Sequence, residues 1–147
     1  MTLMERLNSD MKTAMKNKDK TKLSVIRMVR SSLKNEEIKL NRPLTEEDAL
    51  NVISRELKQQ KDSLNEFEQA DRKDLAEKAR ADIAVLQEYL PEPLTEEEVR
   101  GIVREAIQES GATSKADMGQ VMKIVIPRVK GRADGKMVNR LVQEALQ

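Results

Sequence analysis

The residues of this chain that could do chemistry are mostly cations, and they gather near its C-terminus. Residues 113–147 contain seven Lys and Arg against three Asp and Glu, a net charge of +4. Such side chains bind phosphate oxygens, and each contact adds to the salt dependence of nucleic-acid binding. The candidate phosphate-binding residues are Lys123, Arg128, Lys130, Arg132, Lys136, Asn139 and Arg140.

Lys136 and Arg140 have the i, i+4 spacing that places two side chains on one side of a helix. That side lies opposite the apolar positions Met137 and Leu141, so we expect it to face solvent and to carry Asn139 beside it. The other candidate cations lie in or near the preceding turn. An ordinary solvated surface is the alternative interpretation of the whole set.

The five glycines all lie after residue 100. Glycine in a helix interior costs about 1 kcal/mol relative to alanine. Glycines confined to this part of the chain therefore indicate tight turns there, or a backbone that comes close to a neighbour or ligand. Gly119 is predicted either to pack closely against a neighbouring helix or to let a ligand approach the backbone. Gly131 and Gly135 are predicted to be turn residues, and Asp134 is predicted to cap the last helix.

The chain lacks the usual means of catalysis. It has no His and no Cys, which removes the commonest general base, the commonest metal ligand and every thiolate site. The remaining candidate bases are Asp, Glu, Lys and Tyr89, and no spacing assembles them into a recognisable site. A P-loop and a dinucleotide-binding fingerprint are also absent. We therefore predict no catalytic residue, no metal site and no cofactor.

The composition is that of long amphipathic helices. Charged residues make up 36% and hydrophobic residues 38%, while Phe67 and Tyr89 are the only aromatic residues. No apolar run reaches the ~20 residues of a membrane span. The first residues, Met1–Glu5, lack the basic-then-apolar order of a secretory signal. These features predict a cytoplasmic protein with no membrane contact.

The charge is unevenly distributed. Residues 1–42 carry +6 and residues 113–147 carry +4, whereas residues 43–90 carry −5 and residues 91–112 carry −4. Two interpretations stay open: charge complementarity between packed helices, or a polyanion-binding surface built from one or both basic ends.

Helix starts are marked by capping residues. A hydroxyl side chain precedes an acidic residue by three positions at Thr2, Thr45, Thr95 and Ser114, an arrangement that can satisfy free backbone N–H groups. From these starts, apolar residues recur every three or four positions. The runs are Leu3–Met15, Leu23–Leu33, Leu50–Phe67, Leu75–Leu90, Val99–Ile107, Met118–Val125 and Met137–Ala145. No segment alternates with period two, so the predicted fold is all-α.

Leu90-Pro91-Glu92-Pro93 is the predicted domain boundary, because two prolines favour extended backbone. We predict a four-helix N-terminal domain at residues 1–90, with long second and third helices, and a three-helix C-terminal domain at residues 91–147. The sequence Pro-Leu-Thr-Glu-Glu occurs at both 43–47 and 93–97. Its flanks differ, so we interpret it as repeated capping chemistry rather than duplication.

The C-terminal segment resembles a known family. Gly119-Gln120-Val121-Met122-Lys123, then Gly131-Arg132-Ala133-Asp134, then Val138-Asn139 resemble the tail domain of the GatB subunit of aspartyl/glutamyl-tRNA amidotransferase. The whole chain is similar to the small stand-alone members of the GatB/YqeY family. It departs from the tail at Ile124–Lys130, which is longer by about one helical turn, and at Asp134-Gly135, where the tail often has Asn-Pro.

The resemblance implies two helical domains and a non-catalytic module that helps to grip tRNA. In the amidotransferase, a carbon–nitrogen ligase with glutamine as amido donor, the amidating chemistry lies in other domains. No aromatic residue follows Tyr89, so stacking of single-stranded bases is not expected in this part of the chain. The predicted partner is tRNA, recognised by shape and backbone.

An alternative function is a helical adaptor without RNA contact. Methionine is a flexible apolar residue that suits protein interfaces, and four methionines occur in the first two helical segments. On this interpretation the N-terminal helices bind a protein partner or a second copy of the chain. The residues concerned are Met4, Met11, Met15 and Met28.

Overall fold

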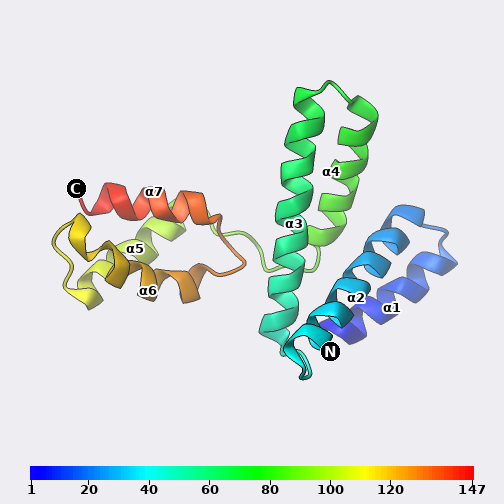
Figure 1. Ribbon diagram of the computed structural model, residues 1–147, viewed down its shortest axis with the longest axis horizontal. Helices are drawn as coiled ribbons and strands as arrows, with labels where there is room; N and C mark the ends of the chain where they lie inside the picture. Colours follow the sequence, from blue (N-terminus) through cyan, green and yellow to red (C-terminus); the bar gives the residue numbers. More distant parts are fainter. The chain divides into compact units, whose positions relative to one another are not determined.

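The computed structural model describes residues 1–147 and contains helices but no strand, which confirms the all-α prediction (Figure 1). The structure has seven α-helices and one short 3₁₀ turn, η1, which lies between α5 and α6. The helices are α1 (Leu3–Lys16), α2 (Lys20–Leu40), α3 (Glu46–Gln69), α4 (Lys73–Gln87), α5 (Glu96–Ser110), α6 (Met118–Val129) and α7 (Gly135–Ala145), with η1 at Lys115–Asp117.

Threonine side chains cap three of the predicted helix starts. The Thr2 hydroxyl accepts a hydrogen bond from the Glu5 N–H, at 3.1 Å. Thr45 and Thr95 each form a complete capping box, in which the acidic side chain three residues on accepts from the threonine N–H. These hydrogen bonds to Thr95 hold the pKa of Glu98 below its ordinary value. The predicted caps at these positions are confirmed.

Two other helix starts show where local prediction succeeds and fails. Asp134 caps α7 by accepting from the Lys136 N–H, as predicted. The predicted cap at Ser114 is wrong, because its side chain makes no capping bond; Asp117 instead accepts from the Thr113 N–H at 3.0 Å. Asp19, which is not among the predicted caps, caps α2 by accepting from the Lys22 N–H.

The chain divides into two compact units, residues 1–90 and 91–147. In the first unit α1 packs on α2, and α3 and α4 form an antiparallel hairpin (Figure 1). Their buried residues come from all four helices, which makes one apolar core. Its fully buried side chains include Leu7, Ile26, Leu33, Ile53 and Leu86.

Tyr89, just past the end of α4, ties this end of the unit to α1. Its ring is buried, and its hydroxyl donates to the Asp10 carboxylate. The Arg6 guanidinium lies 4.6 Å from the ring centroid and donates to the Glu88 carbonyl at 2.8 Å. Burial, and then the hydrogen bond to Asp10, raise the pKa of Tyr89 well above its ordinary value. Tyr89 therefore stays protonated at neutral pH and is a poor general base.

We expect Tyr89→Phe to lower the free energy of unfolding at neutral pH by about 1.5–3 kcal/mol, because it removes one hydrogen bond to a carboxylate. Because the pKa of Tyr89 is raised in the folded state, the protonated hydroxyl contributes its full stability below the unfolded pKa of 10.0. That contribution to the free energy of unfolding is lost as the pH rises above this value. The stability of the variant should thus depend less on alkaline pH than that of the wild type.

Urea unfolding at neutral and alkaline pH measures this difference. Tyr89 is the only tyrosine and the chain has no tryptophan, so near-ultraviolet absorbance follows its ionisation directly. Ionisation of the folded protein at the ordinary tyrosine pKa would contradict the prediction.

The second unit has its own valine-rich core. Helices α5, α6 and α7 all pack on one another, and η1 packs on α6. The connection that precedes α5 is held by the turn before α7: the Leu94 N–H donates to the Arg132 carbonyl at 2.8 Å. The buried residues are Val99, Val103, Ala106, Val121, Val125, Val129, Val138, Leu141, Val142 and Leu146.

Candidate nucleic-acid interface

All seven candidate phosphate-binding residues belong to the second unit, on α6, on α7 and in the turn between them. Arg128 of α6 points to α5. Its guanidinium lies 2.7 Å from a Glu109 carboxylate oxygen and 3.8 Å from Glu105. Arg128 therefore neutralises acidic residues of its own unit.

Arg140 is exposed on α7 with Lys136, as the helical spacing predicts, but it also forms an ion-pair network between α7 and α5. It lies 3.0 Å from Glu96 and 3.3 Å from Glu144, and Arg100 also contacts both of these carboxylates. The hydrogen bond and charge of Glu96 raise the pKa of Arg140. Although Arg140 remains half-exposed, its charge is already compensated.

Arg132 has a structural role as well. Its Nε donates to the Glu92 carbonyl at 3.2 Å, while its own carbonyl accepts from Leu94. These two bonds hold the extended segment after Pro91 against the turn before α7. The structure thus gives all three candidate arginines partners within the same unit.

The lysines differ from the arginines. Lys123 and Lys136 are exposed and take part in no ion pair, whereas Lys130 is exposed but does interact with another residue. The Asn139 side chain accepts from the Gln143 amide at 3.1 Å. Charge complementarity between helices therefore describes Arg128 and Arg140, and a free basic surface describes Lys123 and Lys136. The seven residues do not form one cluster.

Two further exposed cations of the unit, Arg104 and Lys115, also make no ion pair. Neither is among the residues predicted from the sequence. Lys115 lies in the basic segment and was detectable from its charge. Arg104 lies in an acidic segment, and only its geometry on α5 shows that no carboxylate pairs with it.

The motif glycines behave differently from one another. Gly131 has a φ of 75°, as a turn glycine should. Gly135 does not have a positive φ and is instead the first residue of α7. Gly119 is exposed, and a Cβ placed on it would meet no atom within 4 Å. The prediction that Gly119 permits close helix packing is therefore wrong, because no helix lies over it.

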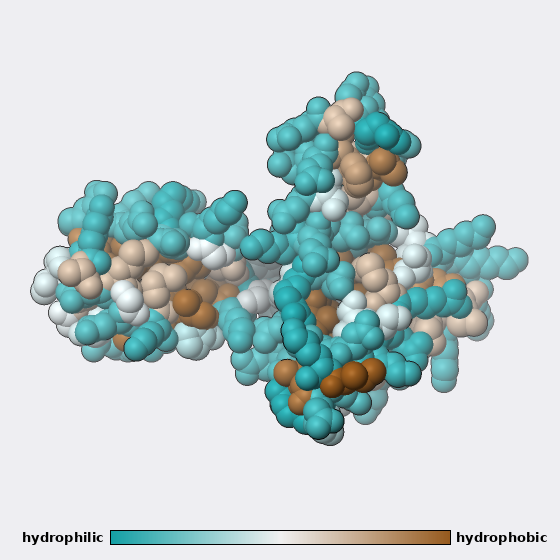
Figure 2. Space-filling view, in the orientation of Figure 1, coloured by the Kyte–Doolittle hydropathy of each residue, from teal (hydrophilic) through white to brown (hydrophobic).

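One side of α6 combines exposure with an absence of negative charge. We define the α6 outer face as Gly119, Gln120, Lys123, Ile126 and Pro127, all of which are exposed. Residues 118–133 contain no Asp or Glu, although acidic residues are common elsewhere. In Figure 2 the surface over α6 is a pale and brown band bordered by hydrophilic residues. The absence of Asp and Glu from residues 118–133 can be read from the sequence alone.

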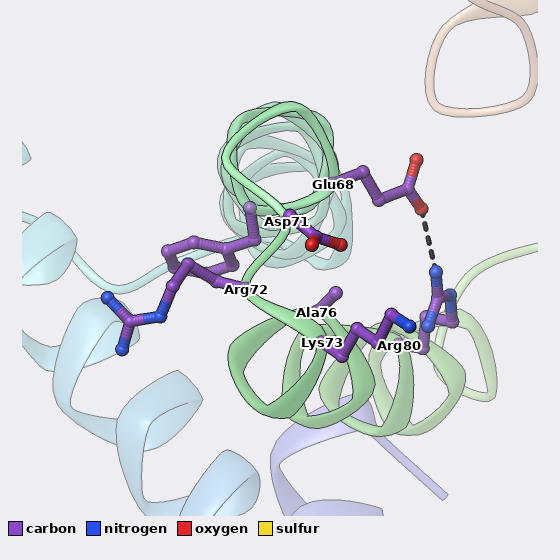
Figure 3. Close-up of a pocket in the computed structure, with 7 residues that line it drawn as sticks. Glu68, Asp71, Arg72, Lys73, Ala76 and Arg80 are labelled. Atoms are coloured by element: carbon purple, nitrogen blue, oxygen red, sulfur yellow. Dashed lines mark hydrogen bonds and ion pairs between the residues drawn. The ribbon is translucent and has the colours of Figure 1, made fainter.

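The pocket at the α3–α4 turn does not resemble the α6 outer face, because charged side chains form most of its lining. Its lining comes from Phe67, Ala76 and charged residues near the turn. Figure 3 shows Arg80 paired with Glu68, at 2.9 Å, and Arg72 directed away from that pair. No three potential metal-ligating side chains meet anywhere in the structure. No helix has both the length and the apolar character needed to cross a membrane.

Comparison with known proteins gives one family. A family model described as a YqeY-like protein matches residues 4–146. A relative from Pyrenophora tritici-repentis, named altered inheritance of mitochondria protein 41, mitochondrial, is 36% identical over 98% of this chain and 81% of its own length. A relative of the same name from Saccharomyces cerevisiae is 30% identical over 90% of this chain, which spans only 63% of that protein.

The relatives contradict the predicted cytoplasmic location, because both are named as mitochondrial proteins. The prediction rests on the lack of a membrane-spanning apolar run and of secretory signal features. Neither observation identifies a compartment. The cytoplasmic prediction is therefore wrong by the evidence of the relatives.

Proposed function

The chain belongs to the YqeY-like protein family, and from this membership we propose that it is a non-catalytic accessory module that binds tRNA through residues 91–147. We further propose that these residues correspond to the tail domain of the GatB subunit. The motif around Gly119 and the motif around Gly131 support that correspondence. The longer segment Ile124–Lys130 forms the second half of α6 and its C-cap, Lys130.

One observation carries the proposal: the second unit retains exposed cations after its internal ion pairs are formed. Lys123 and Lys136 are two of these, and Lys115 is a third. The unit also has no aromatic side chain on which bases could stack. Its surface therefore suits the phosphate backbone of a folded RNA better than unpaired bases.

The test is a filter-binding titration with total tRNA at two salt concentrations. We expect the wild type to prefer tRNA to single-stranded RNA of equal length, and to bind more weakly at high salt. The double variant Lys123→Ala/Lys136→Ala should bind about tenfold more weakly, and its salt slope should fall by about 0.7–0.9 for each phosphate that is no longer neutralised. Lys136 is paired with Lys123 here because Arg140 already has internal partners.

The matched control is Lys58→Ala/Lys61→Ala on α3, which removes two exposed lysines from the acidic part of the chain. It should leave binding unchanged. Circular dichroism should show the same helical content in all variants. Absence of wild-type binding at low salt, or equal weakening in both double variants, would refute a specific interface in the second unit.

A second candidate function is the adaptor, which the exposed apolar side chains of the first unit favour. Met1 is 91% exposed and Ile38 is 69% exposed, and Met4, Met15 and Leu40 are exposed as well. Light scattering after size exclusion would detect self-association. Capture of one specific protein without retained nucleic acid, together with failure of the tRNA titration, would support the adaptor.

A further inference from the structure

Gly119 is a glycine that the fold of this chain does not require. Its φ is not positive, so the backbone conformation is open to other residues. A Cβ at this position would meet nothing within 4 Å, so no packed neighbour excludes a side chain. Alanine would favour the helix more than glycine does. An exposed glycine in this position lets something outside the chain approach the helix backbone closely.

Gly119 is the second residue of α6 and lies in its first turn. The 3₁₀ turn η1 leads directly into α6, and the Met118 N–H donates to the Lys115 carbonyl. The feature of interest is not the set of N–H groups at the N-terminus of α6. It is the exposed side of a helix, where a missing side chain exposes the backbone.

The neighbours of Gly119 on the α6 outer face indicate the charge of the partner. Lys123 follows one turn later, about 6 Å along the helix axis, and it has no ion-pair partner. Ile126 continues the same row and is 48% exposed. A row made of a bare backbone, a lysine and an apolar side chain, in a segment (residues 118–133) without Asp or Glu, suits a polyanion that also presents uncharged surface.

Pro127 adds a backbone feature to the same face. Proline has no N–H, so the Lys123 carbonyl lacks the donor that a helix would normally supply four residues later. Lys123 thus carries both a cation and a backbone carbonyl that has no N–H donor four residues later. Ribose hydroxyl groups can donate to such an acceptor, while phosphates pair with the ammonium group.

We infer that the sugar–phosphate backbone of a folded RNA lies directly on the α6 outer face, with its closest approach at Gly119 and with Lys123 bound to an adjacent phosphate. This inference rests on the proposed tRNA-binding function and locates it on α6 rather than on α7. A side chain at position 119 would hold the RNA away from the helix while leaving the charge of the protein unchanged.

The experiment measures tRNA affinity and thermal stability for Gly119→Ala and Gly119→Gln. Affinity should fall by about threefold for alanine and by at least about tenfold for glutamine, because the longer side chain holds the RNA further from the helix; tenfold corresponds to about 1.4 kcal/mol of binding free energy. The melting temperature should not fall, because both residues are better helix formers than glycine. Lys123→Ala should lower both the affinity and the salt slope.

Gly101→Ala is the matched control, since Gly101 lies within α5 and its added Cβ would meet only the Arg104 side chain at ordinary contact distance. Its affinity should equal that of the wild type. If the wild type binds tRNA and Gly119→Gln binds equally well, the inference is wrong and the proposed function stands. If the wild type binds no tRNA, the proposed function itself is wrong, and a protein partner for this face becomes the leading alternative.

Discussion

Leu141→Asp is expected to unfold the second unit while the first unit remains folded. Leu141 of α7 is 2% exposed and belongs to the core formed by α5, α6 and α7. Truncation of a buried leucine costs about 2–5 kcal/mol, and an unpaired carboxylate in that place adds a further penalty. A unit of this size has a stability of about 3–9 kcal/mol, so the substitution is expected to exceed it.

Circular dichroism and proteolysis would measure the effect. The signal of α5, α6 and α7 should disappear, and cleavage should remove residues after Leu90 while the first unit resists. Met122→Asp should be milder, because Met122 is only partly buried in the same core. Retention of the full helical signal by Leu141→Asp would show that the assigned core is incorrect.

Ile26→Asp should have the opposite result, with the first unit unfolded and the second retained. Ile26 of α2 is fully buried in the core that α1, α2, α3 and the end of α4 share. Because the two units have separate cores, the damage should stay within residues 1–90. The two longest helices, α2 and α3, lie there, so this variant should lose most of the helical signal.

The same variant tests where tRNA binding lies. If residues 91–147 carry the interface, Ile26→Asp should retain tRNA affinity close to that of the wild type, whereas Leu141→Asp should abolish it. Failure of Ile26→Asp to bind, with the second unit shown to be folded by proteolysis, would place the interface in the first unit.

Local sequence determined the helices. The capping residues Thr2, Thr45, Thr95 and Asp134 mark their starts because each interaction spans only two or three residues. The apolar stripes predicted most of the core for the same reason: helical periodicity is a property of neighbouring residues. Ser114 is the exception, since neither it nor Asp117 makes a side-chain capping bond, and the Asp117 carboxylate accepts from the Thr113 N–H instead.

Only the tertiary structure decided what the charged residues do. Arg128 pairs with Glu109, 19 positions away, and Arg140 pairs with Glu96, 44 positions away. Tyr89 bonds to Asp10 across 79 positions. Such pairs depend on how helices are placed against one another, which spacing along one helix does not specify.

Gly119 shows the same division between local and tertiary information. The sequence identified it as unusual within a helix, but two explanations remained, a packed neighbour or an external partner. The structure removed the first because no atom lies over the glycine. The type of residue at each position was thus enough to predict an all-α chain with a basic C-terminal segment. Which of its cations remain free to bind a polyanion was decided by packing, because an arginine is neutralised only where another helix brings a carboxylate within reach.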